Sequence, residues 1–347
     1  MRIVCKTVLL ISCAFASASN AQQAAPEPKR VALTDPVLIV LASKEATARI
    51  FSPEGDRLPI LATLPTGQNP QDVAIARDGR LAYVTNAGDD SLTVLDLEQM
   101  AVRDTLRPSG LKSPTGIAVG ADGKKLFVGS RGTNSLLVLG ASGEKVSELP
   151  VQLPTSVAMS PDGKRLYVTS DSTQSVLAID ASSDKLVATI KTGRQPRGLA
   201  FSSDGKTLVI TCVAQDIMHV VNTATNEIQA TLGAGRAPIG AAVAPSGLFA
   251  YNTTRELQAG TVSSYISVID LRHGNDKARK GHDIPIGTMA SKVLVSDDGQ
   301  FLYIAAMNPT TPSNTVIAVD LAMMELARWV DGGAGVSGMA LRRGRAK

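Results

Sequence analysis

Six basic side chains and one carboxylate are the residues of this 347-residue chain whose types are suited to binding chemistry. Arginine binds carboxylate and phosphate groups bidentately through its planar guanidinium, and lysine adds a compact positive charge. If they converge, these side chains predict a site for a ligand that carries negative charge; the alternative is that they are scattered surface residues. The candidate binding residues are Arg131, Arg194, Arg197, Arg236, Arg255, Lys292 and Asp72.

Signals for a metal, a cofactor or a nucleophile are weaker. A zinc site needs three or four convergent ligands, and the chain has only His219, His273 and His282. We expect His219 to be packed within a strand and the other two to be solvated loop residues, so no metal residue is predicted. The sequence has no Cys-x-x-Cys-His haem motif and no Walker loop. Cofactor and catalytic residues are therefore unknown, and Cys212 is expected to be a buried, inert thiol.

A repeat must position these residues. Its clearest copy, at 153–180, reads LPTSVAMSPDGKRLYVTSDSTQSVLAID. A period near 40 residues that reads as several short strands predicts a blade of a β-propeller. The long last interval indicates an insertion at 256–263, at 272–283, or at both. The turn glycines are Gly79, Gly123, Gly163, Gly205, Gly247 and Gly299, at intervals of 44, 40, 42, 42 and 52 residues.

The ends of the chain complete the count of repeats. Segments 37–40, 47–51 and 61–64 match the second, third and fourth strands of a unit that lacks its first, and 336–341 matches a first strand alone. Six whole units plus this shared one predict an all-β, seven-bladed propeller with four-stranded blades. One blade, shared between the N- and C-termini, would close the ring and leave no unpaired sheet edge there.

The repeat resembles that of a known family. YVTN at 83–86 and YVTS at 167–170, each preceded by Asp-Gly and a basic residue, resemble the YVTN-type β-propeller repeat of exported bacterial proteins. The resemblance covers nearly all of the mature chain and implies the propeller fold. It implies no single activity, because related proteins include scaffolds, ligand binders, some nucleic-acid binders and distant lactonase-like enzymes.

The repeat also predicts where a site would lie. In a propeller the site usually lies at one mouth of the central channel, built here by the Gly-x-x-Pro connections and the loops between second and third strands. The turns with Asp78, Asp122, Asp162, Asp204 and Asp298 would lie on the opposite face, so a basic mouth would attract anions. One register, two residues after each Pro or its equivalent, holds Asp72, Gly116, Ser156, Gly198, Gly240, Lys292 and Gly338.

The N-terminus predicts export. Residues 1–21 read as a signal peptide cleaved after Ala21, with 22–32 as a flexible lead-in and 33–347 as one propeller. A periplasmic or secreted protein is expected, and no segment is long and apolar enough to span a membrane. Leu10-Ile11-Ser12-Cys13 resembles a lipobox, which leaves a lipoprotein as the alternative. The basic C-terminal run, Arg342, Arg343, Arg345 and Lys347, is expected to be a solvated tail.

We therefore predict a monomeric binding or scaffold module whose partner is a small anionic ligand or a protein. The alternative is a metal-dependent, lactonase-like hydrolase or lyase, with carboxylates and amides converging at the mouth, so whether the chain is an enzyme stays open. Nucleic-acid binding is a second alternative, which is disfavoured because the mature charge is nearly balanced and aromatic residues form only 3% of the chain. The candidates for the mouth carboxylates and amides are Asp72, Asn86, Asp90, Asn134 and Asp171.

Overall fold

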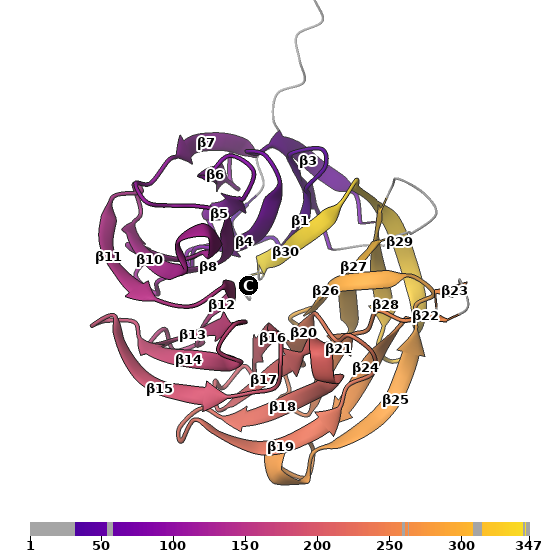
Figure 1. Ribbon diagram of the computed structural model, residues 1–347. Coiled ribbons are helices and arrows are strands. Elements are labelled where there is room, and N and C mark those ends of the chain that lie inside the picture. The colour runs from indigo at the N-terminus through magenta and orange to yellow at the C-terminus, as the bar shows by residue number, and fades with distance from the viewer. Residues whose placement is uncertain are drawn as a thin grey trace, which may run out of the picture.

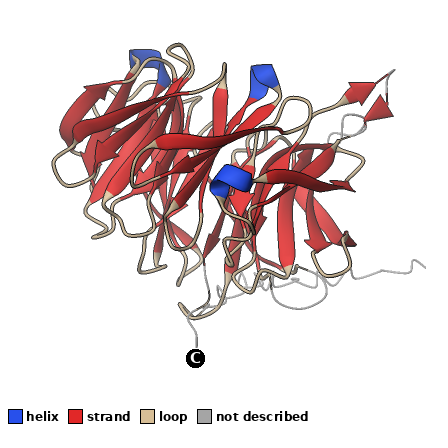
Figure 2. Ribbon diagram, turned by 90° about the horizontal axis from the view of Figure 1, so that it is seen from below, coloured by secondary structure: helices blue, strands red, loops and turns tan. Residues whose placement is uncertain are grey.

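Seven four-stranded antiparallel sheets surround a central channel as the blades of a β-propeller (Figure 1). The computed structural model describes residues 32–53, 58–258, 261–262, 264–307, 314–342 and 344, so the predicted signal peptide lies outside the described residues. Seen from the side, the strands run across the thickness of the ring and the loops lie on its two faces (Figure 2). The predicted seven-bladed fold is confirmed.

The innermost strand of each blade lines the channel, and the second strand pairs with it on the outer side. The inner strands are β4 (Pro70–Ile75), β8 (Pro114–Val119), β12 (Pro154–Met159), β16 (Pro196–Phe201), β20 (Ala241–Val243), β26 (Met289–Val295) and β30 (Val336–Arg342). The second strands are β1 (Val37–Ala42), β5 (Leu81–Asn86), β9 (Lys125–Ser130), β13 (Arg165–Ser170), β17 (Thr207–Cys212), β21 (Phe249–Thr253) and β27 (Phe301–Met307).

The third and outer strands complete each blade toward solvent. The third strands are β2 (Thr47–Phe51), β6 (Ser91–Asp96), β10 (Ser135–Gly140), β14 (Ser175–Asp180), β18 (Ile217–Asn222), β24 (Tyr265–Asp270) and β28 (Asn314–Asp320). The outer strands are β3 (Ile60–Pro65), β7 (Ala101–Leu106), β11 (Lys145–Pro150), β15 (Lys185–Lys191), β19 (Glu227–Gly233), β25 (Arg279–Pro285) and β29 (Glu325–Gly333).

The two ends of the chain close the ring in one shared blade. Strand β30 pairs antiparallel with β1, so that Met339 lies opposite Val40 and Leu341 opposite Leu38. Figure 1 shows this last strand, in yellow, beside the indigo strands from the start of the chain. The predicted closure is confirmed, and it gives the first blade the inner strand that the N-terminal segment lacks.

The hydrophobic core lies between neighbouring blades. Second strands such as β1 and β17 are buried along their whole length, because both faces of the sheet pack against another blade. Tyr167 and Phe201, from adjacent blades, meet edge to face with ring centroids 5.3 Å apart. Elsewhere the joints are filled mainly by Val, Leu, Ile and Ala, as the low aromatic content requires. Burial of these apolar surfaces drives the blades together.

Two motif residues of the repeat have structural tasks. The Thr of the Tyr-Val-Thr run accepts a hydrogen bond from the backbone of its inner strand; Thr169 Oγ1, for instance, lies 2.7 Å from Ser156 N. In the Asp-Gly turn, Asp162 Oδ1 accepts from Lys164 N at 3.0 Å. Gly163 has a φ of 74°, in the region that glycine tolerates best. The residues that recur in the repeat are therefore residues that each blade needs for its structure.

The long interval between Gly247 and Gly299 holds additions at both predicted places. The two-stranded pair β22 (Leu257–Gln258) and β23 (Thr261–Val262) lies between the second and third strands of the sixth blade, and the 3₁₀ helix η3 (Asn275–Lys277) precedes its outer strand. Two further 3₁₀ turns, η1 (Arg131–Thr133) and η2 (Val213–Gln215), lie in other loops. In the described part of the chain, no helix has the length and hydropathy needed to cross a membrane.

The expectation of a solvated C-terminal tail is wrong for Arg342. Its side chain is only 3% exposed. The guanidinium donates to the carbonyl oxygens of Ala32, Asp35 and Gly79 at 2.8 to 3.3 Å. A guanidinium can be buried when backbone carbonyls satisfy its donors. Arg342 thus links the first described residues, the turn of the next blade and the last strand; the other three basic residues lie outside the described ones.

Candidate functional site

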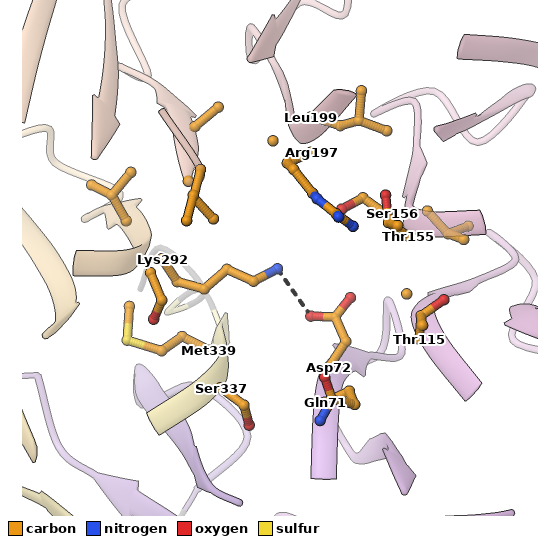
Figure 3. A pocket seen from close by; sticks show the side chains of 18 of the residues that line it. Gln71, Asp72, Thr115, Thr155, Ser156, Arg197, Leu199, Lys292, Ser337 and Met339 are labelled. Carbon is orange, nitrogen blue, oxygen red and sulfur yellow. Dashed lines mark hydrogen bonds and ion pairs between the residues drawn. The ribbon is translucent and has the colours of Figure 1, made fainter. Parts of the chain in front are cut away.

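A cavity of 290 Å³ lies on the propeller axis, where the inner strands begin (Figure 3). We call it the mouth cavity. All seven blades contribute to it the residue that follows Pro or its equivalent, so the cavity is centred on the channel. This ring consists of Gln71, Thr115, Thr155, Arg197, Ile239, Ser291 and Ser337. Sequence reasoning singled out only Arg197 among them, although the same register of the repeat could have found the others.

Hydroxyl groups of this ring tie adjacent blades together. Thr115 Oγ1 donates to the carbonyl oxygen of Pro154 at 3.0 Å, and Thr155 Oγ1 donates to that of Pro196 at 3.2 Å. The hydroxyl of Ser337 makes the corresponding bond to Pro70 in the next blade. These bonds fix the inner strands around the cavity, while each hydroxyl oxygen keeps capacity to accept a further hydrogen bond.

The next ring inward is the predicted small-residue register, and its glycines let neighbouring backbones approach. A Cβ on Gly116 would lie 2.5 Å from Val157 N, and one on Gly198 would lie 2.6 Å from Ile239 O. Backbone from the adjacent blade therefore occupies the space that a side chain would need. Asp72 and Lys292 replace small residues in this register, and both line the mouth cavity.

These two residues form an ion pair in the middle of the cavity, with Lys292 extending from β26 and Asp72 from β4 (Figure 3). Lys292 Nζ lies 3.3 Å from Asp72 Oδ1. The other oxygen of Asp72 accepts from Ile117 N at 3.4 Å. The lysine side chain is 33% exposed and the aspartate side chain 16% exposed, so both remain accessible from the cavity.

Two guanidinium groups add positive charge on the same cavity. Arg197 NH2 lies 3.1 Å from Asp171 Oδ2. Burial lowers the pKa of Arg197; the charge of Asp171 opposes this shift, and the charge of Arg131 adds to it. Arginine remains charged all the same, so Arg131 and Arg197 repel each other across this part of the site. The Arg131 side chain makes no hydrogen bond or ion pair with any described residue.

The remaining predicted arginines do not line the mouth cavity. Arg194 and Arg236 are exposed in the connections that precede the inner strands. Arg255 is partly buried beside Met307, with its NH2 group 3.9 Å from the sulfur atom, and burial lowers its pKa. The structure thus brings together Arg131, Arg197, Lys292 and Asp72, and it separates them from the other three.

The Asp-Gly turn after β4 lies at the other end of the channel. A second cavity, of 600 Å³, is lined there by Asp78 together with Ile75, Met159, Phe201 and Leu341. Strand β4 therefore runs from the mouth cavity, at Asp72, to this opposite cavity. At this blade, Asp78 lies at the opposite end of the channel from the basic residues of the mouth cavity, as predicted for the aspartates of the Asp-Gly turns.

The side chains considered as mouth ligands for a metal make separate contacts. Asp90 pairs with Lys112 at 2.8 Å, Asp171 pairs with Arg197, and Asn134 Oδ1 accepts from Leu153 N. The Asn86 side chain is buried and donates to Ser91 and Thr93. Within the described ranges, no group of three or more His, Cys, Asp or Glu side chains is placed to hold a metal ion.

Two buried groups on the fifth blade match their expected structural roles. His219 is 6% exposed on β18; its Nε2 accepts from Gly193 N at 3.2 Å, and burial lowers its pKa. Cys212 is fully buried, and burial raises the pKa of its thiol to about 11. A thiol with such a pKa is a poor nucleophile near neutral pH. His273 and His282 are both exposed, as expected. His273 lies in a loop, whereas His282 lies on the outer strand β25, so the prediction of a loop residue is wrong for His282.

Known proteins resemble this chain in fold. No family model matches it, and no curated protein matches it significantly. Among solved structures, a functionally unknown protein from Desulfotomaculum acetoxidans has a TM-score of 0.74 at 16% identity. A protein from Bacteroides uniformis, provisionally called a 6-phosphogluconolactonase, has a TM-score of 0.72 at 16% identity. Hydrazine synthase from Kuenenia stuttgartiensis has a TM-score of 0.64 at 21% identity. Each match covers 89% of this chain and 99% of the other.

At these identities the three similarities show the propeller fold alone. Proteins of one fold carry unrelated functions, and function has to be argued from the site. Membership of the YVTN-type family therefore stays a prediction, and the mouth cavity is the feature of this chain from which a function can be inferred.

Proposed function

We propose that the protein binds a small anionic ligand, a carboxylate or a phosphate, in the mouth cavity. The observation that carries the proposal is the positive charge there. Arg131, Arg197 and Lys292 line the cavity, and because Asp171 pairs with Arg197 and Asp72 pairs with Lys292, the charge of Arg131 is in excess. Arg131 has no charged partner among the described residues. Cavities of about 300 Å³ stand at the lower end of the range for small-molecule sites, which favours a compact ligand over a polymer or a protein.

The geometry supports binding of an anion in two further ways. Arg131 and Arg197 repel each other. An anion bound between them would be attracted to both, which would offset their mutual repulsion. Hydroxyl groups of Thr115, Thr155 and Ser337 surround the same cavity and can accept hydrogen bonds from hydroxyl groups of a ligand. Positive charge in a concave opening also raises the local concentration of anions.

Substituting the cavity arginines tests the proposal. Arg131→Ala and Arg197→Ala should each weaken binding by about 1.5 to 3 kcal/mol, roughly 10- to 100-fold, with little change in thermal stability. Calorimetric titration with inorganic phosphate, citrate and 6-phosphogluconate measures the effect. Arg194→Ala is the matched control, because Arg194 lies three residues before Arg197, in the connection that leads to β16, and does not line the cavity. Equal affinities for all four proteins, or no binding of any probe by the unsubstituted protein, would contradict the proposal.

We also propose that the protein is exported and acts in the periplasm or outside the cell. The proposal rests on the basic start, short apolar run and small residues of segment 1–21. Mass spectrometry of the protein recovered from the exported fraction should show Gln22 as its first residue. A lipid-modified Cys13 would instead make it an anchored lipoprotein, and an intact N-terminus on cytoplasmic protein would contradict export.

A further inference from the structure

The carboxylate of Asp72 stands where the fold does not require a side chain. In five of the seven blades the equivalent residue is Gly or Ser. The backbone of Asp72 is already held as in those blades, because Asp72 N donates to Thr85 Oγ1 at 3.0 Å, and Ser156 N does the same to Thr169 Oγ1. The blade therefore has its usual support without the carboxylate.

Strand β30 lies between the strands that carry Asp72 and Lys292, and the backbone of β4 packs directly on it. A Cβ on Gly338 would lie 3.0 Å from Asp72 Cα and 2.8 Å from Gln71 O. Lys292 and Asp72 reach each other across this strand (Figure 3). The pair occupies the centre of the mouth cavity.

The contacts that hold the Asp72 carboxylate are long. Charge-assisted N–H···O bonds usually measure 2.7 to 2.9 Å, whereas its oxygens lie 3.3 Å from Lys292 Nζ and 3.4 Å from Ile117 N. Longer bonds are weaker. A ligand oxygen that approached Lys292 and Ile117 more closely would make stronger bonds than Asp72 does.

We infer that Asp72 is an internal competitor of the ligand: its carboxylate occupies the place that an anionic group of the ligand takes on Lys292 and the backbone N–H of Ile117. The inference rests on the proposed function and adds a residue that sets its affinity and specificity. Binding requires the ligand to displace Asp72, so weakly charged anions are selected against.

The test removes the carboxylate and leaves the blade intact. Asp72→Ser introduces the residue that Ser156 places in the same register, and Asp72→Asn keeps the shape of the side chain. Each should raise the affinity for phosphate and citrate about tenfold, because one negative charge beside Lys292 is lost. Asp78→Asn removes the same charge from the opposite end of the channel and should leave the affinity unchanged, which separates a local effect from a change in net charge.

A double substitution checks the mechanism. In a Lys292→Ala background, Asp72→Ser should have a much smaller effect, since the two residues act on the same ligand group and their effects are not additive. If Asp72→Ser and Asp72→Asn bind the probes no more tightly than the unsubstituted protein, or more weakly, the inference is wrong. Loss of binding in Arg131→Ala would still support the proposed function in that case, whereas absence of binding in every variant would overturn both.

Discussion

A chain that ends at Gly335 should fail to form a stable propeller. The truncation removes β30, whose side chains Val336 and Met339 are 3% and 4% exposed and pack in the core between the shared blade and the blade of β27 and β28. Burial of each such side chain is worth about 1.5 to 3 kcal/mol. The backbone pairing with β1 is lost as well. Because domains are stable by only about 5 to 15 kcal/mol, the combined loss should abolish cooperative folding.

Thermal unfolding followed by circular dichroism measures this effect. A chain that ends at Gly344 is the control, since it keeps the whole of β30 and should melt like the full-length protein. If the chain ending at Gly335 melted within a degree or two of that control, the shared blade would not be needed for the stability of the propeller.

Replacing Arg342 by Ala should produce the largest loss of stability among single arginine substitutions, about 3 kcal/mol. The side chain satisfies the carbonyl oxygens of Ala32, Asp35 and Gly79 in a nearly water-free position. Without it, those oxygens lose charge-assisted bonds and a void is left between the two ends of the chain. Lysine should not restore stability, because a single ammonium group cannot match the planar fork of the guanidinium.

Urea unfolding gives the free energy of unfolding for this comparison. Arg103→Ala, on the exposed face of outer strand β7, is the control and should lie within about 0.5 kcal/mol of the original protein. A similar small value for Arg342→Ala would mean that the carbonyl oxygens find other donors and that the buried guanidinium is dispensable.

The repeat made the architecture predictable because each motif residue has a local task that recurs in every blade. Thr85 and Thr211 accept hydrogen bonds from backbone N–H groups of their inner strands, and Gly163 adopts the positive φ that its turn requires. Such tasks leave a pattern of fixed spacing. The same register also placed Asp72 and Lys292 correctly at the neck of the channel, since one position in the repeat corresponds to one place in the ring.

Which of the predicted arginines line the cavity was not predictable, because residue type and approximate position do not fix where a side chain points. Arg194 and Arg197 are three residues apart, yet only Arg197 lines the mouth cavity. Between them Gln195 has a φ of 56°, so the chain turns just before the inner strand. The burial of Arg342 was not predicted, because a basic run at a terminus usually lies in solvent. Only the closed ring shows that Arg342, within this run, donates to backbone carbonyl oxygens.

The proposal that the mouth cavity binds an anion is tested most directly by a crystal structure of the protein with whichever of phosphate, citrate or 6-phosphogluconate binds most tightly in solution. We expect density for the anion between Arg131, Arg197 and Lys292, with Asp72 turned away from Lys292 Nζ. An anion bound elsewhere, with the ion pair of Asp72 and Lys292 intact and the cavity holding only water, would contradict it.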